Sequence, residues 1–318
     1  MKIFAPSYYQ AFKCKADKCN NNCCIGWEID IDEQTYSHYK AVTGELGKRL
    51  SKCISGDGGV PHFILDSNER CPFLNEKGLC DIIISEGEEC LCEICKNHPR
   101  YKNYYSDRIE IGIGIACEAA AEMVVFSESS FELVLLEDDG EETDSQLWER
   151  EFFQLRRDIF ELLCSGDGDI WKKVEKAQLY VCDRVKKYGV SEMTKMFLEL
   201  EHLDSDWERR LEELGSNTEI TVEELPASLD SAFERLAEYF IYRHLSDGAE
   251  RGDIAERVSF AMLSVRMIAL LCAMEVRKGA NADKHLVADI ARRYSAEIEY
   301  SVENTETLID RMFDDIYG

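Results

Sequence analysis

The sequence predicts an α+β protein, in which a small, irregular, Cys-rich metal-binding domain at the N-terminus is followed by an all-helical bundle. Two observations lead to this prediction. Eleven of the 14 cysteines lie before residue 118, among loops and short strand-like segments. Beyond residue 146 the apolar residues recur at helical spacing. We expect the domains at residues 1–136 and 147–318, joined by the acidic linker EDDGEETDSQ at 137–146.

The first part of the chain is predicted to combine helices with short strands. Residues 33–53 show helical spacing, and Asp32 is placed to cap their first turn. In WEIDID (27–32) acids alternate with apolar residues, which indicates an edge strand with its acids in water. CEAAAEMVVF (117–126) indicates a further helix. The other strand-like segments are HFIL (62–65), DIIIS (81–85) and IEIGIGIA (109–116).

One segment of the helical part is apolar nearly all round, as a membrane span would be. It is VSFAMLSVRMIALLCAMEV, residues 258–276. Arg266 lies in its middle and Glu275 near its end, and charges at the centre of a bilayer are costly. We therefore expect no membrane span there, but the central buried helix of a bundle.

The net charge limits the kinds of partner that we expect, and the first residues indicate the compartment. The net charge is −26, of which residues 1–120 carry only −4. An acidic surface repels phosphate, so we expect no nucleic-acid partner, whereas a lysine-bearing protein is electrostatically favoured. The start, MKIFAPSYYQAFKC, lacks the basic and apolar regions of a signal peptide, so we expect a cytoplasmic protein.

In a reducing compartment, clustered cysteines indicate metal or redox chemistry rather than disulfides. Cys92-x2-Cys95 has the spacing of two ligands on one metal, and adjacent cysteines such as Cys23 and Cys24 rarely bind the same ion. Tetrahedral sulfur sites take zinc or iron–sulfur clusters. Irregular spacing with distant ligands favours a 4Fe-4S cluster, with zinc as the alternative. The candidate ligands are Cys14, Cys19, Cys23, Cys24, Cys71, Cys80, Cys92, Cys95 and Cys117.

Four blocks of the first 120 residues resemble the flagellin lysine-N-methylase family, in order and with shared cysteine spacing and flanking aromatics. Two segments of the helical part, LAEYFIYRHL (236–245) and ARRYSAEIEYSVEN (291–304), resemble its C-terminal blocks. Tyr300 stands where we expect a histidine in that pattern. Cys53 and Cys90 lie outside the blocks and are expected to be dispensable for metal binding. The four blocks are YYQAFKCKADKCNNNCCIGWEIDID (8–32), CPFLNEKGLCDI (71–82), LCEICKNHPRY (91–101) and IACEAA (115–120).

The resemblance implies S-adenosylmethionine-dependent methylation of lysine ε-amino groups on flagellin, by a protein that holds an iron–sulfur cluster. That chemistry needs a group to accept the proton of the lysine, and aromatic faces or carboxylates near the sulfonium. We expect Tyr8, Tyr9, Tyr101 and Tyr105 in catalysis. Cofactor binding is expected from Trp27, Arg100 and Glu118.

Two other classes of function stay open on the residues alone. The Cys-rich domain can be a non-catalytic module that chelates iron or zinc, or the cluster can be structural in a redox or scaffold protein. A Rossmann-type methyltransferase is not indicated, because IEIGIGIACEAA lacks the third glycine of a dinucleotide-binding turn. The spacing Cys-x3-Cys-x2-Cys of radical enzymes is also missing, so we expect polar methyl transfer.

Overall fold

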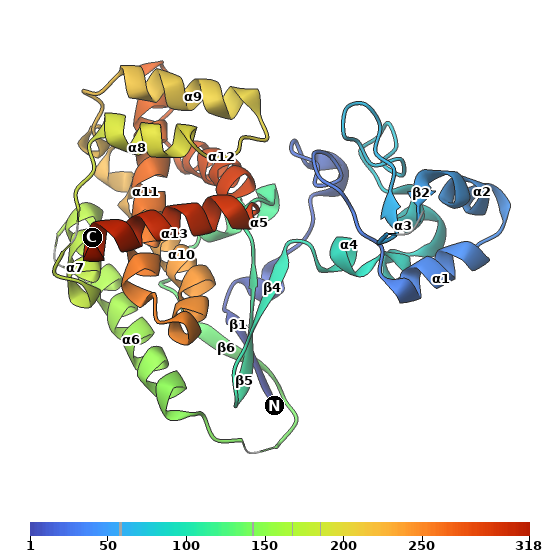
Figure 1. The fold of residues 1–318 in the computed structure, drawn as a ribbon, viewed down its shortest axis with the longest axis horizontal. Coiled ribbons are helices and arrows are strands. Elements are labelled where there is room, and N and C mark those ends of the chain that lie inside the picture. The colour runs from blue at the N-terminus through green and yellow to red at the C-terminus, as the bar shows by residue number, and fades with distance from the viewer. Residues whose placement is uncertain (57–58, 142, 167, 185) are drawn as a thin grey trace. The chain divides into compact units, whose positions relative to one another are not determined.

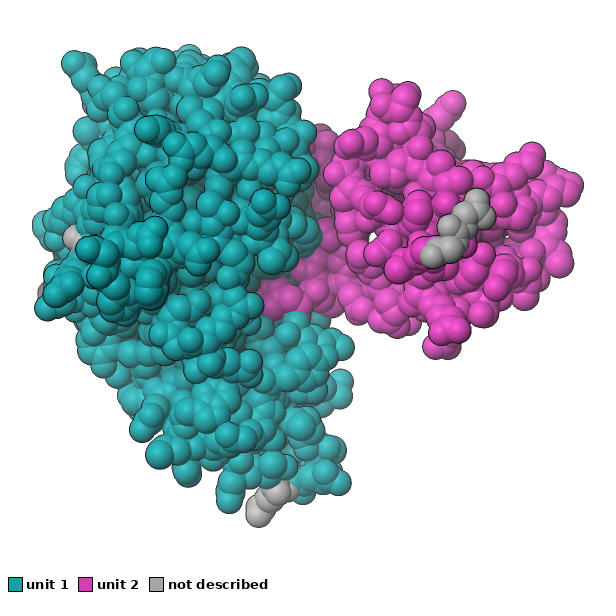
Figure 2. Space-filling view, in the orientation of Figure 1, with its two compact units in different colours: residues 1–12, 102–318 teal, residues 13–101 magenta. Residues whose placement is uncertain are grey.

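The computed structural model describes residues 1–56, 59–141, 143–166, 168–184 and 186–318. The chain forms two compact units, coloured separately in Figure 2. Unit 1 consists of Met1–Phe12 and Lys102–Gly318, and unit 2 of Lys13–Tyr101. Each unit has an apolar core of its own. Helices and a small amount of strand confirm the α+β class.

Unit 2 is built from short elements joined by loops. Its core contains Ile29, Tyr39, Leu50, Phe63 and Phe73, all of them almost fully buried. Its elements are η2 (Ala16–Lys18), α1 (Glu33–Ala41), α2 (Gly44–Cys53), β2 (Ile54–Ser55), β3 (His62–Phe63), α3 (Asp81–Glu86), η3 (Glu88–Cys90) and α4 (Glu93–Asn97).

The helical region expected at 33–53 is confirmed, but it is broken into α1 and α2. Asp32 caps α1 as expected, because its carboxylate accepts a hydrogen bond from the Thr35 N–H at 2.8 Å. The break falls at Val42 and Thr43, and Gly44, the first residue of α2, adopts a φ of 76°, which favours glycine.

Two strand predictions in unit 2 need correction. The segment at 81–85 is wrong as a strand, because it forms helix α3. Asp81 occupies its first turn and is held by Arg49 and Asn75, so tertiary contacts outweigh the strand preference of three isoleucines. WEIDID forms no regular strand in the described chain, although its alternation is as expected. Ile29 and Ile31 are buried, and Asp30 makes an isolated bridge to His62.

Unit 1 begins with a four-stranded sheet of order β4-β5-β1-β6. Strand β1 pairs parallel with β5, with Ile3 opposite Ile109, and antiparallel with β6. Helix α5 packs against α10 and α12. The elements are β1 (Lys2–Pro6), η1 (Tyr9–Ala11), β4 (Arg100–Tyr104), β5 (Arg108–Ile113), α5 (Glu118–Val125) and β6 (Leu133–Asp138).

These pairings divide the chain at different places from those expected. We expected a Cys-rich domain over 1–136, whereas β1, β5, α5 and β6 all belong to unit 1. The reason is physical: β1 completes a sheet with strands more than 100 residues further on. The acidic segment at 137–146 begins within β6 and ends at Gln146, whose capping box with Glu149 starts α6.

Unit 1 continues with a bundle of helices, and Figure 1 shows α11 in the middle of it. They are α6 (Leu147–Cys164), α7 (Ile170–Val181), α8 (Val190–Leu198), α9 (Ser205–Ser216), η4 (Val222–Glu224), η5 (Ala227–Leu229), α10 (Asp230–Arg251), α11 (Ile254–Arg277), α12 (Lys284–Tyr294), the π-helical segment η6 (Ser295–Glu299) and α13 (Val302–Tyr317).

Helix α11 is the central buried helix that the sequence predicts. In the described chain it alone is long and apolar enough to cross a membrane, and 89% of its most apolar window is buried inside unit 1. It contacts α7, α9, α10, α12 and α13.

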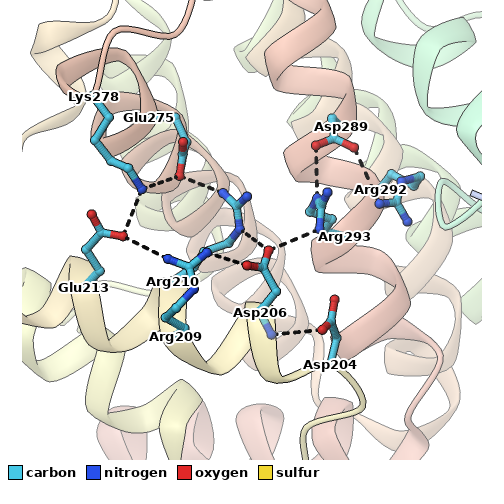
Figure 3. Close-up of polar contacts among 10 residues, drawn as sticks. All are labelled: Asp204, Asp206, Arg209, Arg210, Glu213, Glu275, Lys278, Asp289, Arg292 and Arg293. Carbon is cyan, nitrogen blue, oxygen red and sulfur yellow. Dashed lines mark hydrogen bonds and ion pairs between the residues drawn. The ribbon is translucent and has the colours of Figure 1, made fainter. Parts of the chain in front are cut away.

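Ion pairs join α9 to α11 and α12 (Figure 3). Arg210 binds Asp206 on its own helix and Glu275 near the end of α11, at 2.8 and 2.7 Å. Arg293 of α12 reaches Asp206 from the other side. These contacts tie the amphipathic helix α9 to the bundle.

Candidate metal centre

Six cysteines of unit 2 interact with one another, five of them in or against its apolar core and the exposed Cys23 through Cys24. Cys71 and Cys92 are buried in that core, and Cys24, Cys80 and Cys95 pack against it. Cys23 is hydrogen-bonded through its thiol to Cys24. Electrostatic interactions link these thiols, since Cys95 responds to Cys92, Cys24 and Cys71, and Cys24 responds to Cys71 and Cys80. We call Cys23, Cys24, Cys71, Cys80, Cys92 and Cys95 the thiol cluster.

The loops that carry these thiols are tied together by backbone and side-chain hydrogen bonds. The Cys71 N–H donates to the Cys24 carbonyl at 2.8 Å, which joins the first two loops. Arg49 of α2 donates to Asp81 and to the Pro72 carbonyl, at 2.7 and 2.8 Å. Because these neighbours adjoin Cys80 and Cys71, Arg49 fixes the distance between two of the thiol-bearing turns.

Asp32 has a second role that its capping position did not predict. Its other carboxylate oxygen accepts a hydrogen bond from the Glu93 N–H at 2.9 Å. One side chain therefore caps α1 and also holds the start of α4, where Cys92 is the N-cap residue. Burial opposes the charged form, but the hydrogen bonds from Glu93 and Thr35 prevail and hold the pKa of Asp32 below its usual value.

Backbone N–H groups donate hydrogen bonds to the sulfurs of Cys71 and Cys80. Burial raises the pKa of Cys71 to about 11, although the N–H groups of Phe73 and Leu74 donate to its sulfur and oppose the shift. Burial also raises the pKa of Cys80, against donors from α3. Such donors stabilise a thiolate, so these sulfurs sit in an environment suited to metal ligation.

The thiols form two hydrogen-bonded pairs, Cys23 with Cys24 and Cys92 with Cys95, and the two members of each pair differ in pKa. A hydrogen bond from Cys24 lowers the pKa of Cys23 to about 7, and the same contact raises the pKa of Cys24. Cys95 likewise lowers the pKa of Cys92, whereas its own pKa is raised. In each pair, therefore, one thiol ionises more readily than its partner.

The distances between the sulfur atoms of the thiol cluster affect which metals these thiols can bind. Around a tetrahedral zinc, with bonds of ~2.3 Å, sulfur atoms lie ~3.8 Å apart. Among the described residues, the groups of three ligand atoms within 4.8 Å of one another are His38–Glu86–Cys90 and Glu28–Asp30–His62, and neither includes the thiol cluster. An iron–sulfur cluster takes one thiolate on each iron and spreads them more widely. A set of thiolates is a donor set that both zinc and iron–sulfur clusters accept.

The other predicted ligands have the following surroundings. Cys14 is exposed and accepts the Ala16 N–H, and the Cys19 thiol donates to the Asn21 carbonyl at 3.1 Å. Cys117 is the N-cap residue of α5 and therefore belongs to unit 1. Cys53 and Cys90 pack against the same apolar core of unit 2 but have no contact among those that define the thiol cluster.

The residues predicted to bind cofactor are divided between the units. Trp27 lies beside the thiol cluster, where its indole N–H donates to the Cys23 carbonyl at 2.5 Å and its ring centre is 5.9 Å from that of His98. Arg100 is exposed at the start of β4 in unit 2. Glu118 is buried in the first turn of α5 in unit 1.

The four tyrosines predicted for catalysis differ in burial. Tyr101 belongs to unit 2, and Tyr9 lies on η1 of unit 1; both are partly exposed. Tyr105 is buried against Phe152 and Phe153, and Tyr8 packs against the core of unit 1. Burial raises the pKa of Tyr8 and of Tyr105, so both stay neutral phenols at physiological pH. They therefore suit hydrogen bonding and packing better than base catalysis.

Three residues of the site had no clear signal in the sequence. Arg49 and the second contact of Asp32 depend on segments that come together only in the fold. Tyr39 of α1 is buried next to the thiols, and burial followed by the charges of Cys92 and Cys95 raises its pKa. Its helical spacing would have placed it in the core, but not beside the cysteines.

The comparisons with known proteins agree with the expected resemblance. The chain is 25% identical over 123 residues, 36% of its length, to the flagellar biosynthetic protein FliU of Salmonella muenchen, of which this stretch covers 72%. It is equally similar to the lysine-N-methylases of Salmonella typhimurium and Salmonella choleraesuis, of which it covers 30%. The chain thus spans less than a third of the length of those two enzymes.

No protein-family model matches this chain, and no solved structure does. The likeness therefore rests on sequence, over about a third of the molecule. Over that third, this chain is similar to lysine-N-methylases and to a flagellar biosynthetic protein.

Proposed function

We propose that this chain is an S-adenosylmethionine-dependent protein-lysine N-methyltransferase, that it acts on a flagellin-like protein in the cytoplasm, and that unit 2 holds an iron–sulfur cluster. The observation that carries the proposal is the thiol cluster, in a chain similar to lysine-N-methylases. All 14 cysteines are free thiols, as the reducing cytoplasm requires.

The thiol cluster supplies the metal-binding part of this function. Cys71, Cys80 and Cys92 are held by backbone donors, and Cys24 and Cys95 complete the set around them. When an iron–sulfur cluster is bound by these thiols, it would supply an iron to which the amino and carboxylate groups of the methyl donor can bind. Trp27, which adjoins Cys23, is the aromatic side chain best placed in unit 2 to lie against that donor.

Methyl transfer to lysine requires that the ε-ammonium, with a reference pKa of about 10.4, first lose its proton. The freed nitrogen lone pair then bonds to the methyl carbon as the carbon–sulfur bond breaks, and S-adenosylhomocysteine leaves with the electron pair. Among the predicted tyrosines, Tyr9 and Tyr101 are accessible to a protein substrate. The net charge of −22 on residues 121–318 attracts a lysine-bearing surface.

The experiment is a methylation assay with anaerobically purified protein, flagellin and S-adenosylmethionine. We expect methyl-lysine and S-adenosylhomocysteine without any added reductant. Transfer that occurs only with a strong reductant and yields deoxyadenosine would contradict the polar mechanism. An iron chromophore without any methyl transfer would instead support a chelating module.

A further inference from the structure

A pocket of about 290 Å³ opens in unit 1, away from the thiol cluster in sequence and in unit. It lies between α7, α11 and α13, and Glu223 of η4 and Tyr188 line it as well. Trp171, Met262 and Met312 provide apolar walls, and Arg266 of α11 lines it as well. Its volume is at the small end of the range for ligand sites, which is ~300–1,000 Å³.

Arg266 has no partner within the described chain. Its guanidinium makes no hydrogen bond or ion pair there, and its Nε atom is buried without an acceptor. The lysines at the rim differ in this respect, because Lys187 pairs with Glu175 and Lys186 with Asp315. Arg184, also at the rim, likewise has no ion-pair partner among the side chains the structure describes.

An unpaired arginine is unusual in this chain, which has 63 acidic residues for 37 basic ones. A carboxylate could easily have been placed against Arg266, as Asp206 and Glu275 are placed against Arg210. Arg266 is half-buried, and a buried Nε–H that lacks an acceptor is costly unless a ligand supplies one. A planar oxyanion matches its geometry, since it can accept two parallel hydrogen bonds.

We infer that this pocket binds a small organic anion, whose oxyanion head lies on Arg266 and whose flat, apolar body lies against Trp171, Met262 and Met312. Methionine side chains adapt to the shape of an apolar ligand, and the indole of Trp171 offers a face for stacking. The inference goes beyond the proposed methylation and does not depend on it.

The test uses a matched pair of fluorescent probes. Anilinonaphthalene sulfonate carries a sulfonate head on an aromatic body, and N-phenylnaphthylamine has the same body without the charge. We expect the folded wild-type protein to bind the sulfonate roughly tenfold more tightly or better, as a charged hydrogen-bonding partner predicts. Equal or tighter binding of the neutral probe would overturn the inference.

Variants then locate the site. Arg266→Gln should weaken sulfonate binding roughly tenfold and leave the neutral probe unaffected, whereas Arg150→Gln, the same change on the exposed face of α6, should alter neither. Trp171→Phe should remove most energy transfer from tryptophan to the bound probe. Equal sulfonate affinity in the two arginine variants would overturn the inference, and the comparison in wild-type protein decides it if Arg266→Gln does not fold.

Discussion

The Nε2 atom of His244 lies 2.7 Å from a carboxylate oxygen of Glu299, inside unit 1. The pair joins α10 to the π-helical segment between α12 and α13, and Arg243 and the Tyr239 hydroxyl bind the same carboxylate. His244 and Glu299 lie in the segments 236–245 and 291–304, for which the sequence alone led us to expect a resemblance to the lysine-N-methylase family. The contact is a buried polar link between these two segments of unit 1.

This contact predicts a pH dependence of stability. Burial lowers the pKa of His244, although Glu299 opposes the shift. Below the unfolded pKa of about 6.5, the unfolded chain binds a proton that the folded chain does not, so unfolding becomes easier as the pH falls. The contribution reaches at most about 1.4 kcal/mol per pH unit. His244→Gln should lose less stability than wild type between about pH 7 and about pH 5.5, measured by urea unfolding.

The control for this experiment is His285→Gln, because His285 is exposed on α12. It should show the same pH dependence as wild type. If His244→Gln also follows the wild-type curve, the histidine does not carry the effect.

Two adjacent arginines of α9 should differ in their contribution to stability. Both bind Asp206, and hydrogen bonds from Arg210 and then Arg209 lower the pKa of Asp206 to about 2. The Arg210 side chain is 16% exposed and also binds Glu275, whereas that of Arg209 is 58% exposed (Figure 3). Arg210→Gln should cost about 1–3 kcal/mol, because it removes two charge-assisted contacts of a largely buried guanidinium, even though Lys278 still binds Glu275 at 3.2 Å. Arg209→Gln should cause no resolvable change, and equal losses would show that exposure does not govern these pairs.

The thiol cluster predicts which cysteines the iron chromophore needs. Cys92→Ser removes a buried thiol of the thiol cluster. It should abolish the visible absorbance of the iron chromophore in anaerobically purified protein. Cys53→Ser is the matched control, since Cys53 packs against the same core but lies outside the cluster. Loss of the chromophore in Cys53→Ser, with Cys92→Ser unaffected, would sink the assignment.

Metal removal should destabilise unit 2 selectively. Ligands that gather only in the folded state couple metal binding to folding free energy. After chelation, hydrogen exchange in residues 13–101 should accelerate, while the amides of α11 keep their protection. Equal loss of protection in both units would mean that they unfold as one cooperative body.

Local patterns predicted the helices and the gathering of cysteines better than the boundaries. The periodicity of α10, the continuous apolar run of α11 and the cap at Asp32 are short-range signals, so they could be predicted directly from the sequence. The pairing of β1 with β5 and β6 joins residues more than 100 positions apart, which no local pattern encodes. For the same reason, Cys117 falls in unit 1, and the clamp from Arg49 to Asp81 was not foreseen.

The central claim is that this chain methylates lysines of a flagellin-like protein and depends on its thiol cluster to do so. The most direct measurement is the intact mass of a flagellin co-expressed with wild-type chain, with Cys92→Ser or with neither. The account predicts that flagellin becomes heavier by one or more methyl groups when it is co-expressed with the wild-type chain, and in neither of the other two samples. Unmodified flagellin beside a folded, iron-loaded wild-type chain would contradict it.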